Sequence, residues 1–198
     1  MDTLTQFMNG FAAANQLMVR AGNRGCFVEV VCLATSVVDG LLRMGLVLRH
    51  QLDLRTSDVP AVLIHQAEGD AIVSERRIYR DARSNGIISD DQFKRLEDLY
   101  QRRNRVVHRY VISEITTEQV LQIASEYDEV IGLIGKQVRL LEDQQIATGI
   151  GMTPSDAQVP SDLRADISRH IQEMAAEKHG HQDLASNLKK DKPSKGFR

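Results

Sequence analysis

The sequence predicts an all-α protein, an antiparallel bundle of four to five long helices with a flexible C-terminal extension. Apolar residues recur three and four positions apart through most of residues 1–147, which is the spacing of amphipathic helices. The chain has no Trp, and only 5% of its residues are aromatic, so Leu, Ile, Val and Ala must fill the interior. With 42% hydrophobic and 26% charged residues, the chain has the composition of a globular protein.

Two helices are expected in the first fifty residues. The first covers about residues 3–20 and ends before Gly25. The second covers about residues 26–50 and is apolar around most of its circumference, as a central helix of a bundle is. A membrane span would need about twenty apolar residues without charges, whereas Asp39 and Arg43 lie four positions apart in the middle of this one. We therefore expect a buried bundle helix, with Asp39 either solvated, paired with Arg43 or facing a site.

Three further helices follow a connection at residues 51–69. Residues 72–84 form a short charged helix, which Asn85-Gly86 ends in a left-handed cap. The next helix, about residues 89–113, begins with a Ser-Asp-Asp sequence that suits an N-cap and the positive helix end. The last, about residues 116–147, is about 45 Å long. Its apolar stripe is long enough to serve the core, a dimer contact, or both.

The C-terminal quarter of the chain differs in composition. Residues 148–160 are rich in Gly, Pro, Ser and Thr and are expected to form a linker. Residues 161–178 predict a short amphipathic helix, which must dock on this chain or another because it cannot bury its apolar side alone. That side contains Leu163, Ile167, Ile171 and Met174. Residues 179–198 are polar and basic and are expected to be disordered.

The helix at residues 89–113 carries charge where a core-facing helix should be apolar. On a heptad its apolar seam contains Phe93, Leu96, Tyr100, Arg103, Val107 and Tyr110. Burying an unpaired guanidinium costs several kcal/mol or more, so Arg103 should have a partner, a ligand or a wet cleft. A polar row borders this seam: Glu97, Gln101, Asn104 and His108. We therefore expect a functional site on this helix.

Arg103, His108 and Tyr110 resemble a known motif. Their spacing fits Arg-x4-His-x-Tyr of the HEPN superfamily, in which Asn commonly follows the Arg. The chain is most similar to the HEPN toxins of toxin–antitoxin pairs with a minimal nucleotidyltransferase. The similarity is sharp over about nine residues of the sequence and looser over the helical layout of residues 1–147. The family pattern does not extend to residues 148–198.

The resemblance implies a metal-independent endoribonuclease without a cofactor, which leaves a 2′,3′-cyclic phosphate and a 5′-hydroxyl. It also implies partners. The family usually assembles its cleft from two protomers, and the neighbouring nucleotidyltransferase can act as an antitoxin by adenylylating the motif tyrosine, here Tyr110. The partners expected from the resemblance are therefore RNA, a second copy of the chain and such an antitoxin, with no membrane.

The residue types suit this chemistry. The neutral imidazole of His108 can take the proton from a ribose 2′-hydroxyl, or as imidazolium protonate the leaving 5′-oxygen. The guanidinium of Arg103 can neutralise the charge on the pentacoordinate phosphorus. No metal is required, because RNA carries its own nucleophile. Asn104, Tyr110 and Glu97 are expected to support these two catalytic residues. The predicted RNA-binding residues are Arg102, Arg105 and Arg109.

Each of these residues also has a structural interpretation. Arg103 could extend along the core edge to solvent, and His108 could be an ordinary histidine. Asn104 can hydrogen-bond His108 four positions later, while Glu97 could pair with Arg103 or within its own helix. The motif tyrosine could serve packing, and the outer arginines could simply be solvated. The alternative function is then a non-catalytic HEPN-like interaction or nucleotide-binding module. A helix-turn-helix DNA binder around residues 72–110 is disfavoured by its long turn.

A homodimer would solve a geometric difficulty of the motif. Five residues along a helix turn His108 about 140° away from Arg103, so one helix aims the two side chains poorly at a single phosphate. A facing copy would supply the second pair, and the surplus apolar stripe of the helix at residues 116–147 could be covered by the same contact.

Charge and cysteine usage add little to these predictions. The net charge of −2 gives no argument for nucleic acid, although residues 74–113 hold ten Lys and Arg against six Asp and Glu. Cys26 and Cys32 are expected to be small core residues, since their spacing suits neither a local disulfide nor a metal site. The N-terminus has no signal-peptide pattern, so a cytoplasmic location is expected.

Overall fold

The computed structural model describes residues 2–153, Arg169, residues 171–173 and Ala175. This part of the chain is 76% helical and contains no strand, so the prediction of an all-α bundle is confirmed. Up to residue 153 the helices are α1 (Thr3–Asn23), α2 (Phe27–Leu54), α3 (Ala61–Ile64), α4 (Glu75–Ser84), α5 (Asp90–Arg109) and α6 (Thr117–Thr148).

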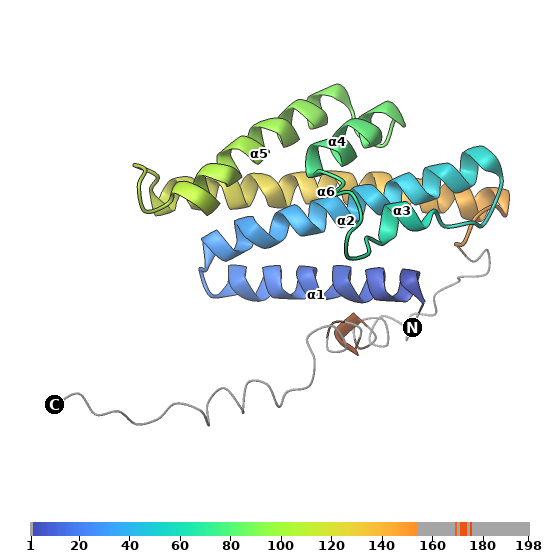
Figure 1. Ribbon diagram of the computed structural model, residues 1–198, viewed down its shortest axis with the longest axis horizontal. Coiled ribbons are helices and arrows are strands. Elements are labelled where there is room, and N and C mark those ends of the chain that lie inside the picture. Colours follow the sequence, from blue (N-terminus) through green and yellow to red (C-terminus); the bar gives the residue numbers. More distant parts are fainter. Residues whose placement is uncertain (1, 154–168, 170, 174, 176–198) are drawn as a thin grey trace.

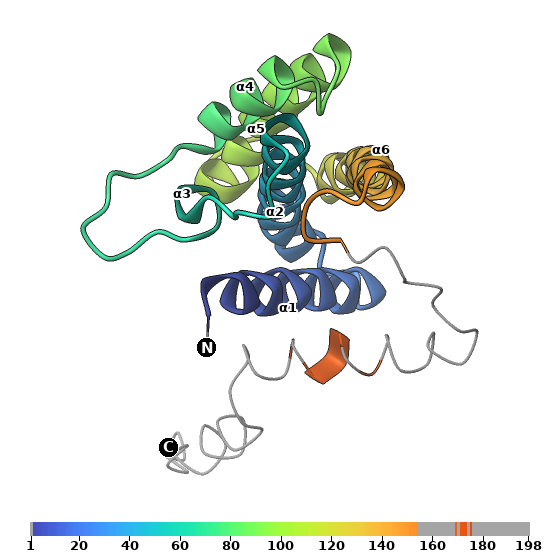
Figure 2. The ribbon, with the colours of Figure 1, turned by 90° about the vertical axis from the view of Figure 1, so that its right-hand side faces the viewer.

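Helix α2 is the central helix of the bundle. It packs most extensively against α6 and α1, and it also contacts α3, α4 and α5. Figure 1 shows α1 along one side of the α2–α6 pair, with α4 and α5 on the opposite side; the end view in Figure 2 shows the same order. Helices α1 and α2 run antiparallel, as do α5 and α6. Because α5 returns the chain to the starting end, α2 and α6 run in the same direction (Figure 1).

The apolar surface of α2 is used inside the bundle. Among the described helices, α2 alone is long and apolar enough to cross a membrane, with a mean hydropathy of 1.8 over an 18-residue segment, and 56% of that segment is buried. The charges in its middle are paired, since Arg43 Nε donates to Asp39 at 2.6 Å and Arg43 Nη1 donates to the Leu63 carbonyl at 2.8 Å. Of the three possibilities for Asp39, the structure has the pair with Arg43.

Two glycines of α2 allow neighbouring segments of the chain to pack closely against it. A Cβ atom at Gly40 would lie 2.6 Å from Cδ2 of Phe11, and one at Gly45 would lie 2.8 Å from Cγ2 of Ile87. A larger residue at either position would push away α1 or the segment between α4 and α5, because packed interiors have little free space.

The N-termini of α5 and α6 begin where the sequence predicted them. Ser89 and Thr116 each cap the following helix, and the glutamine three positions later, Gln92 or Gln119, completes a capping box. Gly86 has a φ of 67°, as the predicted left-handed cap requires. Helix α5 ends at Arg109, earlier than expected, and the β-branched residues that follow it lie in the connection to α6.

The prediction that the cysteines are core residues is wrong. Cys26 and Cys32 are both exposed thiols. Cys26 precedes the first turn of α2, and Cys32 follows the fully buried Val31, so its side chain lies on the outer side of the helix.

Two buried glutamines join the end of α6 to the end of α2. Gln145 Nε2 donates to Gln51 Oε1 at 2.8 Å, and Gln51 Nε2 donates to the carbonyl of Ser57 at 3.0 Å. The backbone amides of Met152 and Thr153 donate to the same two side chains, at 3.3 and 3.2 Å. The first residues of the predicted linker at 148–160 are therefore held against the bundle.

The C-terminal segment contacts α1. Residues 171–173 and Ala175 are helical, and Ala175 is fully buried in a cluster with Ala12 and Ala13 of α1. Ile171 of the predicted apolar side is 40% exposed in the single chain, and small alanines make the close contact with α1. The other residues of that stripe (Leu163, Ile167 and Met174) and the predicted tail at 179–198 lie outside the described residues.

Candidate functional site

The buried side of α5 differs in part from the predicted seam. Its fully buried residues are Leu96, Leu99 and Val106. Arg103 lies among them with a side chain only 16% exposed, but Val107 and Tyr110 are 41% and 40% exposed. The heptad rule cannot choose between neighbouring apolar residues such as Leu99 and Tyr100, and the last turn of α5 extends beyond the core. The predicted interior position of Arg103 is correct, whereas those of Val107 and Tyr110 are wrong.

Arg103 has the partner that its burial requires. It forms an ion pair with Glu75 in the first turn of α4, donates through Nη1 to Asn104 Oδ1 at 2.8 Å, and lies over the Tyr100 ring at 4.9 Å from the centroid. Burial is the largest single effect and lowers the pKa of Arg103, but the charge and hydrogen bond of Glu75, together with Tyr127, outweigh it, so the pKa is raised. Arg103 therefore keeps its positive charge inside the bundle.

Two tyrosines complete the surroundings of this ion pair. The hydroxyl of Tyr79 on α4 donates to Glu75, and Tyr127 on α6 faces Arg103. Burial raises the pKa of both phenols, and the Glu75 carboxylate adds to this effect. The side chains of Tyr127 and Arg103 interact, but neither the Tyr127 hydroxyl nor Arg103 Nε has a hydrogen bond of good geometry. Glu75 and the two tyrosines were not foreseen around Arg103, because nothing in the local sequence of α4 or α6 indicates them.

Glu97 and Asn104 have other partners than expected. Glu97 pairs with Arg76 of α4, whose Nε lies 2.9 Å from Glu97 Oε2, and not with Arg103 or within α5. Six helical positions separate Glu97 from Arg103, so they point to different sides of α5. Asn104 accepts from Arg103 and does not bond His108. Asn104 therefore contacts the Arg of the motif and not its His.

His108 lies on the exposed last turn of α5. Within the described part of the chain its side chain has no hydrogen bond or ion pair, and the same holds for the side chains of Arg105 and Arg109. Arg102 already has two ion-pair partners, since its guanidinium lies 2.8 Å from Glu126 and 3.2 Å from Asp98. Two of the three predicted RNA-binding arginines are therefore free to meet a ligand.

A single chain does not bring Arg103 and His108 together. Arg103 points into the bundle, where it pairs with Glu75, and His108 is exposed. This agrees with the angle of about 140° that five helical positions impose.

Exposed apolar residues lie on both sides of His108 in the sequence. They are Val107, Tyr110, Val111 and Ile112, which are 40% to 94% exposed and which we name the α5 end patch. Tyr110 also lines an open groove with the end of the α1–α2 connection, the first turn of α2 and the first turn of α6. Large apolar side chains exposed so close together in the sequence suit a contact with another molecule.

Comparisons of the chain with protein-family models, with curated proteins and with solved structures find no match. Among the described residues, no three His, Cys, Asp or Glu side chains form a cluster that could hold a metal ion. The function is therefore inferred from the residues around the end of α5.

Proposed function

We propose that the protein is a metal-independent endoribonuclease of the HEPN type. The observation that carries this proposal is the surroundings of His108. A histidine without a competing partner stands on an exposed helix end, with the uncommitted Arg105 and Arg109 three positions before it and one position after it. A general acid–base beside two free guanidinium groups suits a phosphodiester substrate.

In this proposal His108 moves the protons of the reaction. Its neutral imidazole accepts the proton of the ribose 2′-hydroxyl as that oxygen attacks the adjacent phosphorus. The bond to the 5′-oxygen then breaks, and an imidazolium donates the proton that the leaving oxygen needs. The products are a 2′,3′-cyclic phosphate and a 5′-hydroxyl end. A guanidinium bound to the phosphoryl oxygens stabilises the extra charge of the transition state.

We assign the role of charge stabilisation to Arg103, as the motif implies. Glu75 and an RNA phosphate then compete for its guanidinium, which has five N–H donors in a planar fork and uses two nitrogens for Glu75 and Asn104. The α5 end patch supports a second copy of the chain as the missing part of the site. A two-fold contact that covers this patch would place the α5 ends of two protomers next to each other.

We further propose that the protein is a cytosolic toxin controlled by a minimal nucleotidyltransferase. The exposed position of Tyr110 in the single chain supports this, because an adenylyltransferase would need access to the phenol hydroxyl before a second copy covers the α5 end patch. Adenylylation two residues from His108 would add bulk and negative charge that obstruct the cleft. Incubation with the neighbouring gene product and ATP, followed by intact-mass analysis of wild type and Tyr110→Phe, tests this assignment. A mass increase that persists in Tyr110→Phe would exclude Tyr110 as the modified residue.

A non-catalytic interaction module is the second candidate. Two observations favour it: the charge of Arg103 is already neutralised by Glu75, and the α5 end patch could bind a protein partner. In that case the ion pair serves only the fold, and no RNA phosphate reaches Arg103.

Cleavage of RNA in the presence of EDTA separates the two functions. The ribonuclease should cut single-stranded RNA, and His108→Ala and Arg103→Ala should each lower the rate at least a hundredfold, as expected for loss of general acid–base or charge stabilisation. Lys136→Ala, at an exposed position of α6, is the control for substitution itself. Cleavage that survives His108→Ala, or that no RNA elicits, favours the interaction module. A glutamine at position 75 keeps one acceptor oxygen for Arg103 but removes the competing charge, so Glu75→Gln should increase RNA affinity.

A further inference from the structure

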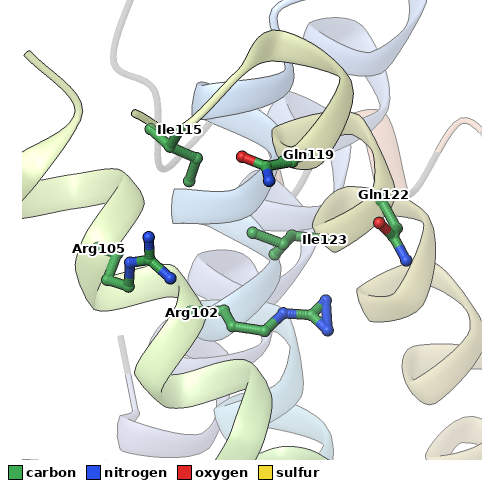
Figure 3. Close-up of a pocket in the computed structure, with 6 residues that line it drawn as sticks. All are labelled: Arg102, Arg105, Ile115, Gln119, Gln122 and Ile123. Carbon is green, nitrogen blue, oxygen red and sulfur yellow. The ribbon is translucent and has the colours of Figure 1, made fainter. Parts of the chain in front are cut away.

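A pocket lies between α5 and the first turns of α6, beside the candidate site (Figure 3). Its volume is about 240 Å³. Ligand pockets for drug-sized molecules are larger, roughly 300–1,000 Å³, so this one suits a single ring system. It is lined by Arg102, Arg105, Ile115, Gln119, Gln122 and Ile123.

The pocket combines an apolar floor with free hydrogen-bond donors. Ile123 is buried in the core and Ile115 packs against it from the connection before α6. Figure 3 shows Ile123 between the α5 arginines and the two α6 glutamines. Arg105 has no partner in the described part of the chain. Gln119 Oε1 already accepts from the Thr116 amide at 3.0 Å, so the Nε2 group of Gln119 remains available to a ligand.

The hydrogen-bonding capacity of the pocket is unbalanced toward donors. Arg102 lines one side of the pocket, and its ion pairs with Glu126 and Asp98 neutralise its charge. Arg105 contributes the one uncompensated charge among the lining residues. With the acceptor oxygen of Gln119 in use, the amide oxygen of Gln122 is the remaining side-chain acceptor of the lining. A ligand that fits must therefore present acceptors and a flat apolar face.

We propose that this pocket binds one nucleobase of single-stranded RNA and prefers bases with a carbonyl oxygen over adenine, which has none. The base would lie against the isoleucines, with its carbonyl oxygen toward Arg105 and Gln119. Arg is the usual partner of the guanine O6 and N7 acceptors. The inference rests on the proposed function for its ligand class. Arg105 is three positions before His108, so a base in the pocket would set which phosphate reaches His108 and thereby the sequence preference of cleavage.

Binding is measured first without cleavage. Isotope-labelled protein is titrated with GMP, UMP and AMP while the side-chain amide signals of Gln119 and Gln122 are followed. GMP and UMP should bind about tenfold more tightly than AMP, the effect of one hydrogen-bond partner lost in a partly desolvated site. Arg105→Gln should weaken GMP and UMP about tenfold. Gln119→Glu keeps the capping box but replaces the donor by an acceptor, so it should abolish the preference over AMP.

Matched controls test whether these effects belong to the pocket. Gln144→Glu makes the same change on an exposed side of α6, about 37 Å further along the helix, and Arg80→Gln removes an exposed arginine of α4. Neither should change any of the affinities. AMP binding as tight as that of GMP and UMP, or unchanged affinities in Arg105→Gln, overturns the proposal.

A second arm distinguishes RNA from free nucleotides. Uridine and adenosine hexamers with 2′-fluoro sugars cannot be cleaved, and the uridine hexamer should bind more tightly than UMP and than the adenosine hexamer. UMP binding as tightly as its hexamer would assign the pocket to free nucleotides and overturn the RNA assignment. If wild type binds these ligands as stated but cuts no RNA, the ribonuclease proposal fails and the pocket stands. If Arg105→Gln and Gln119→Glu cut RNA with unchanged rate and base preference, the pocket fails while the ribonuclease stands.

Discussion

Replacing Glu75 with alanine should lower the free energy of unfolding by about 3 kcal/mol. The Glu75 and Arg103 side chains are 18% and 16% exposed, so the substitution leaves a guanidinium charge mostly out of water without its counter-charge. Removing one partner of a buried ion pair costs about 3–5 kcal/mol. We expect the lower end because some water reaches both groups. The Tyr79 hydroxyl would also lose its acceptor, and this loss is included in the value.

Urea and thermal unfolding, followed by far-UV circular dichroism, measure the effect. For a domain of this size a loss of about 3 kcal/mol should lower Tm by roughly 6–12 °C. The double variant Glu75→Ala/Arg103→Met should recover most of the loss, because the buried charge is then gone and an apolar side chain fills its place. The coupling free energy from the double-mutant cycle should be at least about 2 kcal/mol.

Asp53→Ala is the control for removing a paired carboxylate at the surface. Asp53 is 57% exposed and its oxygen lies 3.9 Å from Arg49, so this change should cost less than about 1 kcal/mol. If Glu75→Ala were no more destabilising than Asp53→Ala, or if the double variant were no more stable than Glu75→Ala, the ion pair would not be what holds Arg103.

Three further predictions concern the bundle itself. Gly45→Ala should lower the free energy of unfolding by about 1–3 kcal/mol through overpacking, since its Cβ would lie 2.8 Å from the buried Ile87. Gly132→Ala meets nothing within 4 Å and should stabilise α6 by about 0.5–1 kcal/mol. Equal effects of the two substitutions in urea unfolding would refute the close contact at Gly45. Gln145→Leu should speed hydrogen exchange of the amides that follow α6, and unchanged exchange would show that the glutamine pair does not hold that segment. In alkaline titration followed by absorbance, two of the four tyrosines should ionise only as the protein unfolds, because burial raises the pKa of Tyr79 and Tyr127 above the ordinary value of 10.0. Their contribution to stability is complete below pH 10.0 and is lost as the pH rises above it, since the unfolded chain then releases protons that the folded protein keeps; early ionisation of all four would contradict their burial.

The sequence by itself determined the helices and their starting points. Apolar spacing predicted the long helices, and the Ser89 and Thr116 caps were visible because a cap acts within about three residues of its own position. The same local information placed Arg103 on the inner side of α5 and required a partner for it. The Asp39–Arg43 pair, four positions apart on one helix, was predictable for the same reason.

Only the tertiary structure decided which groups meet across helices. Arg103 pairs with Glu75, 28 positions earlier, and Gln145 bonds Gln51, 94 positions earlier. Such pairs depend on how far each helix is rotated about its axis and on the angle at which it crosses its neighbours. Those quantities follow from the packing of many side chains at once, so no local pattern encodes them. For that reason the sequence left Glu97 to pair either with Arg103 or within its own helix, whereas α4 brings Glu75 to Arg103 and Arg76 to Glu97.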